Sequence, residues 1–293
     1  MLFSGLQRGE GRAALPVFLA TGIALLGIAL LFAMILISAV PAFLDQTGGG
    51  VFTWSWRPYQ GEFGILAMLA GSVILAGSAL LLAWPFSLAL CAWIVTSPQS
   101  PFLGVVRGCV RLMTAVPTVV YGFAAVFLVT PLARAGLGGS GFCWLAAALV
   151  LALLILPTIV LILEAGLTPR LERLCPGGLA LGMNRMELLW FFVLPQSGKT
   201  LLSAVLLGAG RAFGDTLLPL MLAGNAPQVP SGLGDGLRTL TAHMALVTAN
   251  EVGGAAYNSL FAAGALLLVI SAAVSLTLRR LQGAGAGRKE LPR

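Results

Sequence analysis

The chain has 293 residues, of which 58% are apolar and only 9% are charged, with a formal net charge of +7. A soluble domain carries about 25% charged residues, so this chain has too little charge to cover a water-facing surface, and a soluble globular enzyme is excluded. Disorder is excluded as well, because disordered segments have low hydrophobicity. The composition indicates an integral membrane protein, and we attribute the positive charge to membrane topology rather than to nucleic-acid binding.

Six segments of the chain are long and apolar enough to cross a membrane. A helix needs about 20 apolar residues to cross a hydrocarbon core of roughly 30 Å. Helices are expected rather than barrel strands, because the segments are long and uniformly apolar. The sequence predicts an all-α membrane protein with spans near 15–40, 65–95, 111–133, 144–166, 200–222 and 257–279.

The Lys and Arg residues are distributed unevenly between the two sides of these spans. Thirteen of the 17 fall on the side that carries both termini, three fall on the other side, and Arg211 lies within a span. Loops rich in Lys and Arg remain in the cytoplasm, so both termini are expected there. We divide the chain into 1–64 (N-terminal tail, first helix and an outer loop), a core 65–280 and a basic cytoplasmic tail 281–293.

The cytoplasmic segment 167–199 is the most informative connection. It is rich in charge and in Leu, and its pattern indicates two short helical pieces around Gly182. The spacing from Gly182 through nine residues to Phe192, and then to Leu194 and Pro195, resembles the EAA-x3-G-x9-I-x-LP signature of ABC importer permeases. This resemblance implies a MetI-like fold and a loop that docks on a separate ATPase.

Four further segments resemble phosphate permeases, and two of them favour the PstC-type subunit. VPTVVYG at 116–122 resembles the VPSVVYG segment of that family, and GRAFGDT at 210–216 resembles its GRAxGET segment. WRP at 56–58 and LRTLT at 237–241 resemble the PstC-type subunit more than its PstA-type partner. Because the segments occur in the same order as in the family, the resemblance extends over roughly 54–280.

The resemblance implies a division of work among subunits. The chain would be a permease in the bacterial inner membrane, not an enzyme, with no bound cofactor or metal. A second, PstA-like permease, a cytoplasmic ABC ATPase dimer that uses ATP, and an external phosphate-binding protein would complete the importer. One departure concerns the ATPase contact: Pro176, Gly177 and Gly178 stand in place of the EAA triplet, so coupling is expected to depend on residues such as Arg185 and Glu187.

Arg211 and Asp215 are the expected substrate-pathway residues. A charged side chain at the bilayer centre costs about 2.5–3.5 kcal/mol on insertion scales, so two in one span need a reason. Being four residues apart, they are expected on one helical face. Either they form a structural ion pair, or the guanidinium binds a passing oxyanion and the carboxylate holds it between passages. The family resemblance implies a role for the pair in phosphate translocation.

Other residues are candidates for a gate and for coupling. Pro117, Tyr121 and Gly122 are the candidate gate, because a proline in an apolar span kinks or ends a helix. An ordinary kink is the alternative interpretation. The candidate coupling residues are Gly182, Arg185, Glu187, Leu194 and Pro195.

Two alternative functions stay open on the sequence. The first keeps the permease and changes the cargo to another oxyanion, molybdate or sulfate, although the two phosphate-type segments favour phosphate. The second is an intramembrane serine protease, in which Ser140 of a Gly-x-Ser-Gly run would act with His243, the single histidine. The four cysteines are scattered and offer no spacing typical of a metal site.

Overall fold

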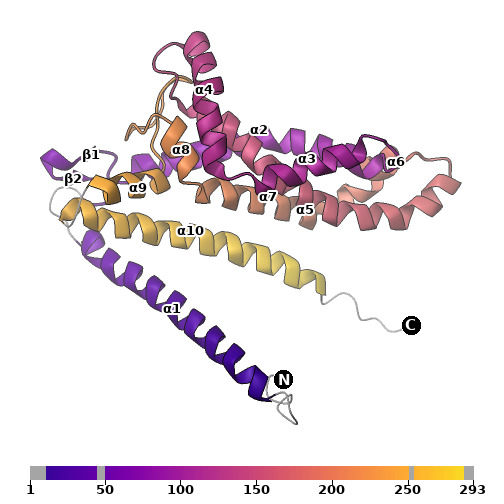
Figure 1. The fold of residues 1–293 in the computed structure, drawn as a ribbon, viewed down its shortest axis with the longest axis horizontal. Helices are drawn as coiled ribbons and strands as arrows, with labels where there is room; N and C mark the ends of the chain where they lie inside the picture. Colours follow the sequence, from indigo (N-terminus) through magenta and orange to yellow (C-terminus); the bar gives the residue numbers. More distant parts are fainter. Residues whose placement is uncertain (1–10, 45–49, 251–253, 287–293) are drawn as a thin grey trace.

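The structure is a computed structural model that describes residues 11–44, 50–250 and 254–286 and is helical almost throughout (Figure 1). Five of its helices are long and apolar enough to span a membrane: α1 (Gly11–Leu44), α2 (Leu66–Thr96), α4 (Thr118–Leu137), α5 (Trp144–Ala180) and α10 (Ala255–Ala286). The bent pair Arg185–Val193 and Pro195–Gly214, with an angle of 51°, makes a sixth if it is counted as one span. The end of the expected basic tail, 287–293, lies outside the described residues.

Helices α2, α5 and α7 (Gly198–Gly214) form the centre of the bundle, and α5 packs against both of the others. Alanines such as Ala79 of α2 and Ala147 of α5 are fully buried there. A Cβ added at Gly208 of α7 would lie 2.9 Å from Cγ1 of Ile159 in α5. Small residues therefore set the close spacing of these helices, as is usual for helices that pack in lipid.

The span expected near 111–133 is confirmed as α4, but it starts later than expected. An amphipathic helix, α3 (Leu103–Ala115), ends before Pro117, and α4 begins after it. Proline has no backbone N–H, and it disfavours the helical conformation in the residue that precedes it. Val116 is accordingly extended, and only α4 retains the length and composition of a span.

The segment 167–199 is mostly helical, which corrects its interpretation as a loop. Helix α5 continues through its first part, because buried residues recur at helical spacing at Leu167, Leu171 and Cys175. A turn at Gly182 separates α5 from further helical structure, as the sequence predicted. That structure consists of α6 (Arg185–Glu187), a π-helical segment (Leu188–Val193) and a 3₁₀ turn (Pro195–Ser197).

The span expected near 200–222 is also broken. Helix α7 ends at Gly214, and α8 (Leu217–Leu222) begins after Asp215 and Thr216. Glycine costs roughly 1 kcal/mol relative to alanine in a helix, which favours a break at this position. The break places the start of α8 beside the expected substrate pathway.

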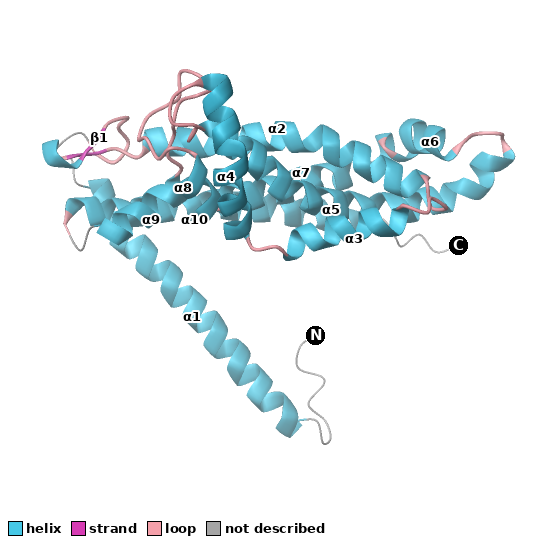
Figure 2. Cartoon of the chain, turned by 45° about the horizontal axis from the view of Figure 1, so that its top comes forward, coloured by secondary structure: helices cyan, strands magenta, loops and turns pink. Residues whose placement is uncertain are grey.

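Short elements gather at one end of the bundle, and α6 lies at the other (Figures 1 and 2). The strands β1 (Trp56–Arg57) and β2 (Glu62–Phe63) pair antiparallel, with a 3₁₀ turn (Pro58–Gln60) between them, and α9 (Leu240–Asn250) lies close by. The start of α1 and the end of α10 both lie far from this end (Figure 1). Which end faces the cytoplasm stays a prediction from the Lys and Arg distribution.

Helix α1 stands apart from the bundle over most of its length (Figures 1 and 2). It packs on α10 near its C-terminal end, where Ala42 joins a buried cluster with Ala262 and Ala263. Toward its start it diverges, and side chains such as Phe18 and Ile23 are exposed. A helix that is apolar all round is covered by lipid or by another protein, so α1 belongs in a membrane.

Candidate translocation site

Arg211 lies near the end of α7 and reaches across to α5. Its Nη1 donates a hydrogen bond of 2.9 Å to Oγ1 of Thr158, and both side chains are half-buried. The acceptor is a neutral hydroxyl, so this contact does not compensate the positive charge of the guanidinium. Sequence reasoning missed Thr158, although the residue was visible as a hydroxyl within an apolar span, directly after Pro157.

Asp215 does not share a helical face with Arg211, and the expected geometry of the pair is wrong. Asp215 follows the end of α7 with extended angles, φ -77° and ψ 126°. Its carboxylate lies near backbone N–H groups at the start of α8, while Oδ2 is buried without a hydrogen-bond partner among the described residues. Within the described part of the chain the only ion pair joins Arg107 to Glu164, so Arg211 and Asp215 interact only through space.

Around Arg211, residues from motifs that the sequence predicted separately lie close together. Arg211 borders a mainly apolar cavity of about 270 Å³ between α7 and α10, to which Ser271 and Ser275 contribute hydroxyls. It is also close enough to Tyr121 of α4 to act on that side chain electrostatically. The structure therefore brings the expected pathway residues, Arg211 and Asp215, into one region with the expected gate residue Tyr121.

The three candidate gate residues lie at the break between α3 and α4. Pro117 directly precedes the first residue of α4, and Tyr121 Oη donates a hydrogen bond of 2.9 Å to the carbonyl oxygen of Met113, across the break. Gly122 is buried against α8, where an added Cβ would lie 2.7 Å from Sδ of Met221. These contacts fix the angle between α3 and α4 and the spacing of α4 from α8. A gating role for them stays a prediction.

The candidate coupling residues lie at the α6 end of the molecule (Figure 2). Gly182 turns the chain with a φ of 81°, in the left-handed region that favours glycine. Asn184 Oδ1 accepts a hydrogen bond from the backbone N–H of Glu187, and Glu187 Oε2 accepts one from the N–H of Asn184, each at 2.8 Å. This reciprocal pair is a capping box, and it fixes the start of α6 at Arg185.

The same coupling segment, 182–195, exposes aromatic side chains, with Phe191 71% exposed. It ends with Leu194, which is buried, and Pro195, which is exposed. A Cβ added at Gly178, the last of the three residues in place of the EAA triplet, would collide with Cδ2 of Leu188. Glycine at that position therefore lets the coupling segment pack closely on the end of α5.

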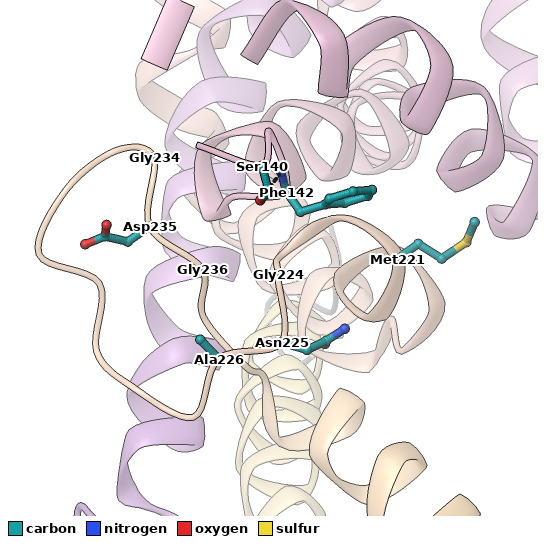
Figure 3. Close-up of a pocket in the computed structure, with 9 residues that line it drawn as sticks. All are labelled: Ser140, Phe142, Met221, Gly224, Asn225, Ala226, Gly234, Asp235 and Gly236. Atoms are coloured by element: carbon teal, nitrogen blue, oxygen red, sulfur yellow. Dashed lines mark hydrogen bonds between the residues drawn. The ribbon is translucent and has the colours of Figure 1, made fainter. Parts of the chain in front are cut away.

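At the opposite end, the connection 223–239 between α8 and α9 folds over the bundle. Gly224 and Leu237 form a parallel bridge that closes the connection into a loop. Between them, Asn225 has a positive φ of 53°, and its carbonyl oxygen accepts a hydrogen bond of 2.9 Å from Nε of Arg238. A cavity of about 540 Å³ lies between this loop and the turn from α4 to α5 (Figure 3).

The structure does not bring together the Ser–His pair that a serine protease requires. Ser140 lies in the turn from α4 to α5, where its Oγ accepts a hydrogen bond of 3.2 Å from the N–H of Phe142 (Figure 3). His243 is fully buried in α9, with its ring centroid 4.3 Å from that of Trp56. Neither ring nitrogen of His243 has a hydrogen-bond partner among the described residues, so Ser140 is not bound to this base.

The sequence also matches a known family of membrane transport proteins. Residues 88–285 match the family described as binding-protein-dependent transport system inner membrane component, which is more than half of the chain. The chain belongs to this family. It is a multi-pass protein of the inner membrane and the permease subunit of an ABC importer.

Individual relatives are similar over most of the chain. YqgH of Bacillus subtilis, a probable ABC transporter permease, is 30% identical over 231 residues, which cover 78% of this chain and 75% of that protein. The phosphate transport system permease protein PstC of Haemophilus influenzae is 28% identical over 276 residues, which cover 86% and 87%. The expected resemblance to PstC-type permeases is thereby confirmed.

Solved structures support the fold. A chain of the MetNI methionine ABC transporter, in an inward-facing conformation, aligns with a TM-score of 0.53 at 18% identity and covers 74% of this chain and 94% of that chain. A second crystal form of the same transporter gives a TM-score of 0.55 at 16% identity. At these identities the likeness shows the fold alone, and it confirms the expected MetI-like architecture.

Proposed function

We propose that this chain is the PstC-like permease subunit of an ATP-driven importer that carries inorganic phosphate across the inner membrane. The observation that supports the proposal best is the state of Arg211. This permanently charged side chain lies in α7 and is bound to the hydroxyl of Thr158 in the spanning helix α5 rather than to a carboxylate. A half-buried cation without a carboxylate contact is suited to attract an anion.

The chemistry of Arg211 suits a tetrahedral oxyanion. The guanidinium presents a planar fork of N–H donors that matches two oxygens of a phosphate group. The single contact with Thr158 is a hydrogen bond to a neutral hydroxyl, and a bidentate contact with an anion that carries charge is stronger, so an arriving anion can replace it. A pathway residue must also release its cargo, and one guanidinium holds an anion less tightly than a closed binding site does.

Phosphate is favoured over other oxyanions by the similarity of the sequence to phosphate permeases, both in short segments and over most of the chain. The segments 116–122 and 210–216 resemble those of phosphate permeases, and they supply Tyr121, Arg211 and Asp215 to the candidate site. Several relatives with 26–28% identity over most of the chain carry the name of a phosphate permease. Molybdate and sulfate have similar shape and charge, so they are the alternatives that an experiment must separate.

The energy comes from a cytoplasmic ABC ATPase dimer that docks on the coupling segment, 182–195. Its capping box gives it a defined start, and exposed aromatic side chains such as Phe191 offer a contact surface. A PstA-like second permease completes the membrane part, and a phosphate-binding protein docks at the end that carries β1 and β2. Coupling requires the ATPase to bind two permease conformations with unequal affinity.

Uptake of radiolabelled oxyanions tests the cargo. The four-component complex, reconstituted in proteoliposomes with ATP inside and the binding protein outside, is supplied with phosphate, molybdate or sulfate. We expect ATP-dependent accumulation of phosphate and little of the other two. Accumulation of molybdate or sulfate without phosphate would contradict the cargo but not the permease.

A further inference from the structure

Arg238 is a half-buried cation that has no role in the pathway proposed above. It lies in the connection 223–239, and its Nε donates a hydrogen bond of 2.9 Å to the carbonyl oxygen of Asn225. The two Nη groups make no hydrogen bond to any described residue. Burial lowers the pKa of the Arg238 guanidinium, and no neighbouring carboxylate offsets that effect. The guanidinium is therefore partly desolvated and has no carboxylate partner among the described residues, which suits it to bind an anion.

The backbone around Arg238 is firmly placed. A Cβ added at Gly71 of α2 would collide with the carbonyl oxygen of Arg238, so the two backbones are in close contact. The N–H of Leu240 donates a hydrogen bond of 2.8 Å to Oγ of Ser72, one residue further along α2. These contacts hold the backbone that carries Arg238 in place, and the hydrogen bond from Nε to Asn225 orients the guanidinium, as a binding residue requires.

The titratable groups near Arg238 do not neutralise it. Asp235 is close in sequence, but Oδ2 of its carboxylate accepts three hydrogen bonds, from N–H and Oγ of Ser231 and from N–H of Gly232. His243 is a second nearby titratable group, and its burial, together with the charge of Arg238, lowers its pKa to about 3. His243 is therefore neutral at physiological pH and adds neither charge nor compensation.

We propose that Arg238 is an oxyanion-binding residue at the β1–β2 end of the permease, where it receives the anion before the anion reaches Arg211. The inference rests on the proposed function and extends it to a second site. A polar connection joins the two regions: Oγ1 of Thr241 donates a hydrogen bond of 3.0 Å to the carbonyl oxygen of Asp215, and it lies 3.2 Å from Oγ1 of Thr239, next to Arg238.

Two variants separate binding from a purely structural role. Arg238→Gln removes the charge but keeps an N–H donor that can reach the carbonyl oxygen of Asn225. Arg238→Lys keeps the charge and loses the planar fork. In reconstituted complexes we expect Arg238→Gln to raise the KM for the phosphate-loaded binding protein by about tenfold, and Arg238→Lys to raise it less. A KM for Arg238→Gln equal to that of the native complex would overturn the inference.

Protection from chemical modification tests the site without transport. Phenylglyoxal modifies accessible arginines, and mass spectrometry measures its reaction with Arg238 in the detergent-solubilised complex. Phosphate should slow this reaction more than chloride does at equal ionic strength. Arg57, which is exposed at the same end of the molecule, is the internal control and should show no difference between the two anions.

The outcomes distinguish this inference from the proposed function. Protection by sulfate or molybdate alone would support an oxyanion site at Arg238 while contradicting phosphate as the cargo. Equal rates of modification in all the anions would overturn the site, whatever the complex transports.

Discussion

At the scale of single residues, two arginines make the same kind of contact at different places along one helix pair. Arg211 of α7 donates to Thr158 of α5, and Arg170 of α5 donates to Oγ1 of Thr200 in α7 at 3.0 Å. Arg170 lies toward the α6 end of these helices, and Arg211 lies near the other end of α7 beside the break before α8. The arginine contact alone therefore does not define a pathway, and its position beside Asp215 and Tyr121 distinguishes Arg211.

His243 is expected to make stability depend on pH. Its folded-state pKa of about 3 lies below the usual 6.5, so below pH 6.5 the unfolded chain binds a proton that the folded chain excludes. The contribution of His243 to the free energy of unfolding is therefore fully present above pH 6.5. It is lost at about 1.4 kcal/mol per pH unit as the pH drops toward 3. Thermal unfolding of the purified complex between pH 7.5 and 5.5 measures this loss.

A matched variant identifies the source of the pH dependence. His243→Phe keeps a ring against Trp56 and cannot titrate, so its unfolding temperature should change less between the two pH values than that of the native protein. If native and variant lose the same number of degrees, the burial of a neutral His243 is not responsible for the acid sensitivity.

At the scale of helices, glycines allow two elements to pack in close contact. Gly71 of α2 is in backbone contact with Arg238, so Gly71→Ala must displace one of the two chains. Overpacking of this kind costs typically 1–3 kcal/mol. We expect a lower unfolding temperature of the complex, together with weaker anion protection of Arg238.

Gly77 of the same helix is the control for that variant. An added Cβ there meets no atom within 4 Å, and alanine is favoured over glycine in a helix by roughly 0.5–1 kcal/mol. Gly77→Ala should therefore leave the unfolding temperature unchanged or raise it. Equal loss of stability in both variants would indicate that the α2 contact with Arg238 is not the cause.

The sequence predicted the apolar helices well and their breaks poorly. Apolar length alone locates α1, α2 and α10, because a span in lipid needs little more than uniform hydrophobicity. The breaks at Val116 and Asp215 depend on local backbone preferences and on packing, which a count of apolar residues does not register. The extension of α5 was missed because charged residues follow its span, although the buried stripe continues at Leu167 and Leu171.

The candidate site was predicted in part. Arg211 was conspicuous as a charge in an apolar segment, and its relation to Tyr121 followed once both motifs were placed in the fold. The pairing with Asp215 was wrong, because spacing by four residues implies a shared face only where the helix continues. Thr158 was visible as a hydroxyl in an apolar span, but its contact with Arg211 required coordinates. The lack of a carboxylate partner for Arg238 also required coordinates, because the sequence does not show which side chains lie close together in space.

At the scale of the whole molecule, the structure is one part of a larger assembly. Helix α1 is apolar all round and packs only near one end, and aromatic side chains of the coupling segment are exposed at the α6 end. These surfaces are left for lipid and for the proposed partners. The proposed pathway runs from Arg238 at the β1–β2 end to Arg211, and we propose that a partner ATPase supplies its driving force.

The most direct test compares Arg211→Ala with Arg170→Ala in ATP-driven uptake of radiolabelled phosphate by the reconstituted complex. Each variant removes an arginine that is bound to a threonine hydroxyl between α5 and α7, so the two share the same local structural loss. We expect Arg211→Ala to assemble normally and to take up no phosphate above the passive leak, while Arg170→Ala retains uptake. Native-level uptake by the assembled Arg211→Ala complex would contradict a phosphate pathway past Arg211.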